Sequence, residues 1–86
     1  MKENSQTIKA YISENDIVLD LKNAITFIGN ANVYNSLGQL LFSKKMQFLN
    51  GVQSLQIPNF KSWSNGALFL QIQSDNKNYY VKLMKQ

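Results

Sequence analysis

The side chains that could perform acid–base or metal chemistry are few in this chain. Its 86 residues include no histidine and no cysteine, so the commonest general base, the commonest metal ligand and every thiolate are missing. The carboxylates that remain are Glu3, Glu14, Asp16, Asp20 and Asp75. A catalytic carboxylate pair needs a defined separation across a cleft, and nothing in the sequence suggests one. We therefore expect no enzymatic activity, no catalytic residues, no cofactor and no metal site.

The basic charge of the chain comes entirely from lysine. Nine lysines and no arginine give a formal net charge of +4, and the lysines are scattered along the chain. Proteins that read nucleic acids usually rely on arginine for bidentate contacts. We interpret the lysines chiefly as a solubilising surface and expect no nucleic-acid partner, while an anionic partner remains the alternative.

The chain ends within or directly after a strand pattern. Its last residues are Tyr-Val-Lys-Leu-Met-Lys-Gln, at positions 80–86. A strand that ends at a free carboxylate, flanked by Lys82 and Lys85, offers a handle to a receptor. Such a receptor could add a strand beside it or bind the terminus.

The elements that would position these residues are short strands. Turn-forming pairs such as Asn50-Gly51 and Asn65-Gly66 divide the chain at short intervals. Between the turns, apolar residues alternate with polar ones, as in strands with one buried and one solvated face. The residues expected to face the core are Ile17, Leu19, Leu21, Leu55, Ile57, Leu68, Leu70, Ile72, Tyr79, Val81 and Leu83.

Weaker patterns at residues 7–12, 31–34 and 39–44 complete a count of about seven strands. Residues 25–28 either begin the strand that ends at Tyr34 or form a separate piece, and the run at residues 40–42 fits either register. No window shows a helical stripe. We predict an all-β fold, an immunoglobulin-like antiparallel β-sandwich. It would form one domain over residues 7–86, preceded by a polar leader or linker remnant at residues 1–6.

Export signals and membrane anchors are not evident in the sequence. No apolar run approaches the ~18 residues of a membrane span, and the polar residues 1–6 do not resemble a signal peptide. If the domain is exported, its export signal lies on a longer precursor.

Four segments stand out along the chain: "VYNSLGQLL" at residues 33–41, "NGVQSLQI" at 50–57, "NGALFLQI" at 65–72 and "VKLMKQ" at 81–86. Together they resemble a known family, the type A C-terminal sorting domain of the type IX (Por) secretion system. Their order and spacing match the family over nearly the whole chain. Two features depart from it: an early Asn-Pro element is missing, since the only proline is Pro58, and the usual aromatic of the third segment is Leu68, with Phe69 one position later.

The resemblance implies a passive recognition module at the C-terminus of a secreted cargo protein in Gram-negative bacteria. The domain would pass through the periplasm and direct its cargo through the outer-membrane type IX translocon to the cell surface or the medium. A sortase-like peptidase would then typically remove it, cutting near residues 5–7. The residues expected to be recognised by the translocon are Gly66, Lys82, Leu83, Met84, Lys85 and Gln86. Gly66 would shape a turn, Leu83 would pack, and the two lysines would make charged contacts.

Two other functions remain open at the level of the sequence. A carbohydrate-binding or adhesive module would expose aromatic residues on a sheet face, and the candidates are Tyr11, Trp63, Phe69 and Tyr80; for Trp63 we favour a role in covering a sandwich edge. A structural spacer would require the native protein to continue beyond Gln86. Weak dimerisation through an exposed strand edge is also left open.

Overall fold

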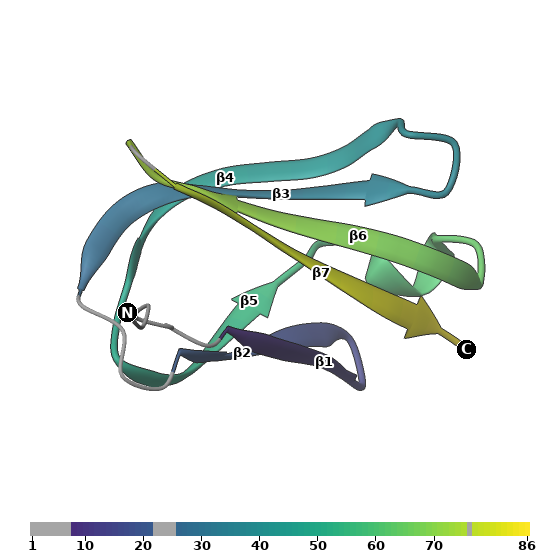
Figure 1. The fold of residues 1–86 in the computed structure, drawn as a ribbon. Coiled ribbons are helices and arrows are strands. Elements are labelled where there is room, and N and C mark those ends of the chain that lie inside the picture. Colours follow the sequence, from purple (N-terminus) through teal and green to yellow (C-terminus); the bar gives the residue numbers. More distant parts are fainter. Residues whose placement is uncertain (1–7, 22–25, 76) are drawn as a thin grey trace, which may run out of the picture.

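The computed structural model describes residues 8–21, 26–75 and 77–86. They form seven strands and one short 3-10 turn (Figure 1). Within these residues no helix is long and apolar enough to cross a membrane. The elements are β1 (Lys9–Ser13), β2 (Asp16–Leu21), β3 (Phe27–Asn35), β4 (Leu40–Phe48), β5 (Gly51–Gln56), η1 (Phe60–Ser62), β6 (Gly66–Gln73) and β7 (Asn78–Lys85).

The strands form two antiparallel sheets, which confirms the predicted sandwich of seven strands. The three-stranded sheet has the order β1-β2-β5, and the four-stranded sheet has the order β4-β3-β6-β7. In constant-type immunoglobulin domains the fourth strand joins the first, second and fifth. Here β4 stays beside β3, because the short turn at residues 36–39 joins the two strands as a hairpin.

The core lies between the two sheets and contains the residues that period-two alternation predicts. Ile17, Leu19 and Leu21 of β2 are fully buried, and Leu70 and Ile72 of β6 are buried opposite them. Tyr79 and Val81 of β7 are half-buried against this cluster, while Leu83 is inside it. The alternation was informative because successive side chains of an extended strand point to opposite faces.

Two large aromatic residues complete the core from places that alternation does not identify. Phe48, the last residue of β4, is fully buried and stacks on Phe27 with a centroid separation of 4.9 Å. Phe60, the first residue of η1, closes the opposite end of the core. The prediction omitted both, because each follows a stretch whose apolar pattern is interrupted by lysine, asparagine or proline.

The structure settles three ambiguities of the sequence. Residues 27–35 form one strand rather than two pieces, and residue 25 lies outside the described part. β4 continues to Phe48, four residues beyond the predicted end. A bulge decides the facing at residues 40–42: Phe42 pairs with Val33 on the core side, Leu40 pairs with Tyr34, and Leu41 is the extra residue.

One predicted solvent-facing residue is not solvated. Val18 points away from the core, as the alternation indicates, yet it is only 8% exposed. It lies between Tyr11 of β1 and Ser54 of β5 in the register of the three-stranded sheet. The neighbouring strands of this small sheet thus shield a side chain of the central strand even on the outer face.

Each side of the sandwich is formed by one edge strand from each of the two sheets. β1 and β7, the edge strands of their sheets, lie alongside each other. β4 and β5 are the edges of the other side and are joined by Leu49 and Asn50. Gln53 bridges the two sheets there, because its Nε2 donates to the Gln47 carbonyl at 2.8 Å and its Oε1 accepts from the Leu49 amide at 3.0 Å.

Candidate recognition surface

Three of the four motif segments meet at one end of the sandwich. β6 lies between the other two strands. Its Leu68 pairs with Asn35 of β3 on one side, and its Gly66 pairs with Lys85 of β7 on the other. In Figure 1 the turn between β3 and β4, the beginning of β6 and the end of β7 lie together at the right-hand end of the molecule. Segments up to about fifty residues apart in the chain thereby share one surface.

The hairpin of the first segment owes its shape to Asn35 and Gly38. Gly38 has a φ of 84°, a left-handed conformation that favours glycine. The side-chain Oδ1 of Asn35 accepts hydrogen bonds from the amides of Leu37 at 2.9 Å and Gln39 at 3.0 Å. A short side chain with a carbonyl oxygen is suited to this position because it replaces the backbone partners that a turn lacks.

Gly66 stands at the start of β6, next to the end of β7. Its φ of 131° is again a conformation that residues with a side chain rarely adopt. Gly66 therefore has a backbone conformation that favours glycine, and its position beside Lys85 places it next to the last strand.

Lys85 ties the last strand to the loop before β6. Its Nζ donates to the carbonyl oxygen of Trp63 at 3.0 Å and to Oδ1 of Asn65 at 3.3 Å. The same ammonium lies 5.5 Å from the centroid of the Phe60 ring, within the range of a cation–π contact. Lys85 is half-buried, so it has a structural role that the sequence did not reveal.

The remaining predicted recognition residues of β7 divide between the two faces of the strand. Leu83 is buried in the core. Lys82 and Met84 point to the outer face and are exposed, as is Gln86 after the strand. Only Lys82, Met84 and Gln86 of the predicted set are thus freely accessible side chains.

A groove separates the hairpin tip from the loop that Lys85 holds. It has a volume of about 390 Å³ and is lined by Leu37 and Leu41 on the hairpin side and by Trp63, Asn65 and Ala67 on the other. Leu37 is 82% exposed, although it is a large apolar residue. The sequence contained a signal that we did not use: a leucine in a tight polar turn has no place in the core.

The aromatic residues proposed for carbohydrate binding do not share a face. Tyr11 lies on the outer face of the three-stranded sheet, whereas Phe69 and Tyr80 lie on that of the four-stranded sheet. Trp63 is half-buried and meets the Phe60 ring edge-on at a centroid distance of 5.1 Å. This arrangement does not favour the carbohydrate-binding alternative, and it assigns Trp63 to covering the end of the core.

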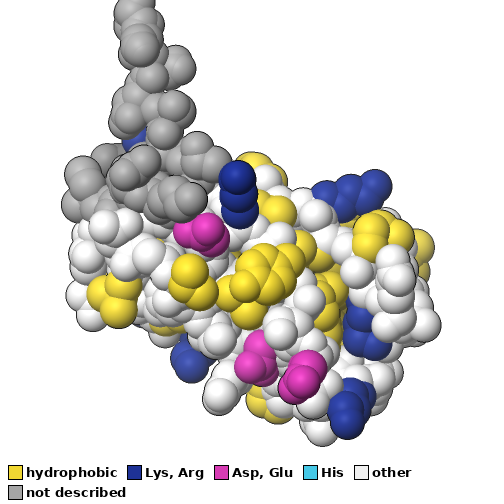
Figure 2. Space-filling view, turned by 90° about the horizontal axis from the view of Figure 1, so that it is seen from below, with side chains coloured by type: hydrophobic (Ala, Val, Ile, Leu, Met, Phe, Trp, Pro, Cys, Tyr) yellow, Lys and Arg dark blue, Asp and Glu magenta, His cyan; other side chains and the backbone are white. Residues whose placement is uncertain are grey.

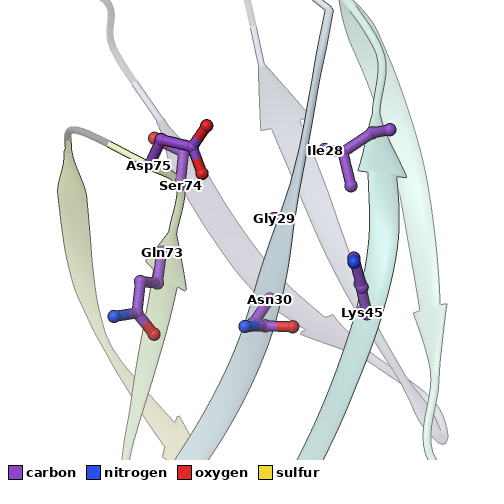
Figure 3. A pocket seen from close by; sticks show the side chains of 7 residues that line it. All are labelled: Ile28, Gly29, Asn30, Lys45, Gln73, Ser74 and Asp75. Carbon is purple, nitrogen blue, oxygen red and sulfur yellow. The ribbon is translucent and has the colours of Figure 1, made fainter.

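A second hollow lies at the opposite end of the four-stranded sheet, near the end of β6. Lys45 and Asp75 line it on different sides, with Gly29 between them and Gln73 on the side of Asp75 (Figure 3). A Cβ atom at Gly29 would collide with the Gln73 carbonyl, so β3 and the end of β6 approach closely here. None of the residues that line this hollow belongs to a motif segment.

On the face that Figure 2 shows, charged side chains do not gather into a site. Lysine, acidic and apolar side chains are interspersed there. Among the residues that the structure describes, no three His, Cys, Asp or Glu side chains are grouped as metal ligands.

Comparison with known proteins gives a family match for most of the chain. The family model described as "Secretion system C-terminal sorting domain" matches residues 13–86. A search of curated proteins finds no match. The matched range includes all the motif segments and every strand from β2 to β7. The chain therefore belongs to the family of secretion system C-terminal sorting domains, the sorting signals that direct attached N-terminal cargo, through the type IX secretion machinery, to the cell surface or the medium.

Proposed function

We propose that the type IX translocon recognises this domain at the end of the sandwich where the motif segments meet. The observation that carries the proposal is the convergence of Gly66, the exposed Lys82 and Met84, and the groove beside Leu37 on one end. Recognition there would use Gly66, Lys82, Leu83, Met84, Lys85 and Gln86 in different ways.

The side chains that a translocon protein would contact are Lys82, Met84 and Gln86, because they are exposed. Leu83 and Lys85 would act by holding β7 in place, through the core and through Trp63 and Asn65. Since β1 lies alongside β7, a partner would reach the outer face and the end of β7 more readily than the full length of its edge. This differs from simple strand addition along β7.

The fate of the domain follows the family pattern in this proposal. The cargo would cross the periplasm before the outer-membrane step, and a sortase-like peptidase would remove the domain from the cargo. The expected cleavage position near residues 5–7 lies outside the described residues. β1 lies almost entirely before the range of the family match, yet it pairs with β2. The folded unit would therefore begin before Lys9.

A secretion assay tests the recognition surface. Residues 7–86 are fused behind a reporter with an N-terminal export signal in a host that has the translocon. The double variant Lys82→Ala/Met84→Ala should reduce reporter in the medium by about tenfold or more, an interaction loss of about 1.4 kcal/mol. The matched control is Lys45→Ala/Ile28→Ala, which removes an exposed lysine and an exposed apolar residue from the opposite end.

Point variants are preferable to the deletion of residues 82–86, because that deletion also removes Leu83 from the core. Both double variants must keep the thermal stability of the parent domain. Secretion at the parental level by the Lys82/Met84 variant, or an equal loss in both variants, would show that recognition lies elsewhere.

A further inference from the structure

The four strand edges of this sandwich are protected to very different degrees. Unpaired edge strands are templates for association, and proteins usually guard them with lysine, bulges, proline or a covering segment. β4 carries the adjacent exposed Lys44 and Lys45 and a bulge at Leu41. β7 carries Lys82 and Lys85, and it lies alongside β1, which begins with Lys9.

Among the residues that the structure describes, β5 has none of these protections. Its six residues, Gly-Val-Gln-Ser-Leu-Gln, include no charge and no proline. It is the last strand in the order β1-β2-β5, and within the described residues no strand pairs with its outer edge. Val52, next to this edge on the outer face, is 71% exposed.

The composition of β5 permits pairing with a second copy of itself. In an antiparallel pair related by a two-fold axis, residues that stand opposite each other must share a face of the sheet. An axis through Ser54 satisfies this condition: Ser54 meets its own counterpart, and Val52 meets Gln56 of the other copy. The same operation on β4 would bring the lysine pairs of two copies together, which is unfavourable.

We propose that this domain self-associates through β5, so that two three-stranded sheets continue as one six-stranded sheet. The strand offers only about 20 Å of edge, which is too short for pairing along it to bury the roughly 1,200 Å² of a stable interface. The association is therefore weak and depends on concentration. β5 lies on the side of the sandwich away from β7, so pairing leaves Lys82 and Met84 accessible, and the inference does not depend on the proposed function.

Sedimentation equilibrium of the 86-residue chain, from about 10 µM to about 1 mM, tests the proposal. The parent chain should shift from monomer towards dimer over this range. Ser54→Lys places like charges opposite each other and should weaken the dimer by about tenfold or more. The matched control is Gln47→Lys, which adds the same charge at an exposed position of β4 and should leave the association unchanged.

A second variant and a second measurement guard against misfolding as an explanation. Val52→Lys alters the same edge at another exposed position, and thermal unfolding by circular dichroism shows whether each variant remains folded. In NMR spectra, concentration-dependent amide shifts should concentrate in residues 51–56. A parent chain that stays monomeric at about 1 mM, an equal effect of Gln47→Lys, or shifts centred on β4 or β7 would overturn the proposal.

Discussion

At the scale of single residues, the two lysines of β7 differ more than their sequence positions suggest. Lys82 is exposed on the outer face, whereas Lys85 is half-buried and donates to Trp63 and Asn65. The difference follows from strand geometry, because residues separated by three positions point to opposite faces. One lysine is available to a partner, and the other is committed to holding the end of β7.

Substitution of Lys85 by methionine should therefore lower the stability of the domain. Lys85→Met keeps the length of the side chain but removes two hydrogen bonds and the charge over the Phe60 ring. We expect a loss of about 1–2 kcal/mol in the free energy of unfolding, measured by urea denaturation. Lys82→Met is the control and should change stability by less than about 0.5 kcal/mol; equal losses would contradict the structural role of Lys85.

At the scale of the elements, polar side chains add hydrogen bonds between strands that already pair through their backbones. On the outer face of the four-stranded sheet, Asn32 accepts from Ser43 at 2.7 Å and donates to Gln71 at 3.2 Å, and Gln71 donates to Tyr80 at 3.3 Å. These bonds cross β4, β3, β6 and β7 in one row. They specify the register of the sheet because a slip of one residue would turn these side chains into the core.

The link between the two sheets at β4 and β5 depends on Gln53, and its removal should loosen this side of the sandwich. Gln53→Ala eliminates the bonds to the Gln47 carbonyl and the Leu49 amide. We expect a loss of about 1–2 kcal/mol and faster hydrogen exchange at the Leu49 amide, measured by NMR. Gln56→Ala, on the exposed face of the same strand, is the control. Unchanged exchange at Leu49 in the Gln53 variant would be inconsistent with this link.

At the scale of the whole molecule, stability depends on a thin core without a covalent cross-link. The chain has no cysteine, and a domain of this size has about 4–13 kcal/mol of stability in total. Single buried aromatic residues therefore account for a large share of it. Phe60 is the clearest case, because it closes one end of the core and also supports Trp63 and Lys85.

Truncation of Phe60 should bring the domain close to unfolding. Phe60→Ala removes a buried ring and should cost about 3–5 kcal/mol, which lowers the Tm by more than about 12 °C in a domain of this length. Phe60→Leu fills most of the space and should cost less than about 2 kcal/mol. Thermal unfolding followed by circular dichroism measures both. If the two variants melted together, the packing role assigned to the ring would be wrong.

The sequence by itself determined the fold class, the inward residues of β2, β6 and β7, and the need for glycine at Gly66. Each of these depends on neighbours in the chain: alternation is a property of extended backbone, and left-handed turns require particular residues locally. The resemblance of the motif segments also sufficed to identify the family.

Only the tertiary structure decided which segments become neighbours. Lys85 reaches Trp63 across 22 positions, Phe60 enters the core from an irregular stretch, and the bulge at Leu41 sets the facing of Phe42. The unguarded edge of β5 likewise follows from strand order. Such contacts join residues that are distant in sequence, and their energies depend on how the two sheets pack rather than on any local pattern.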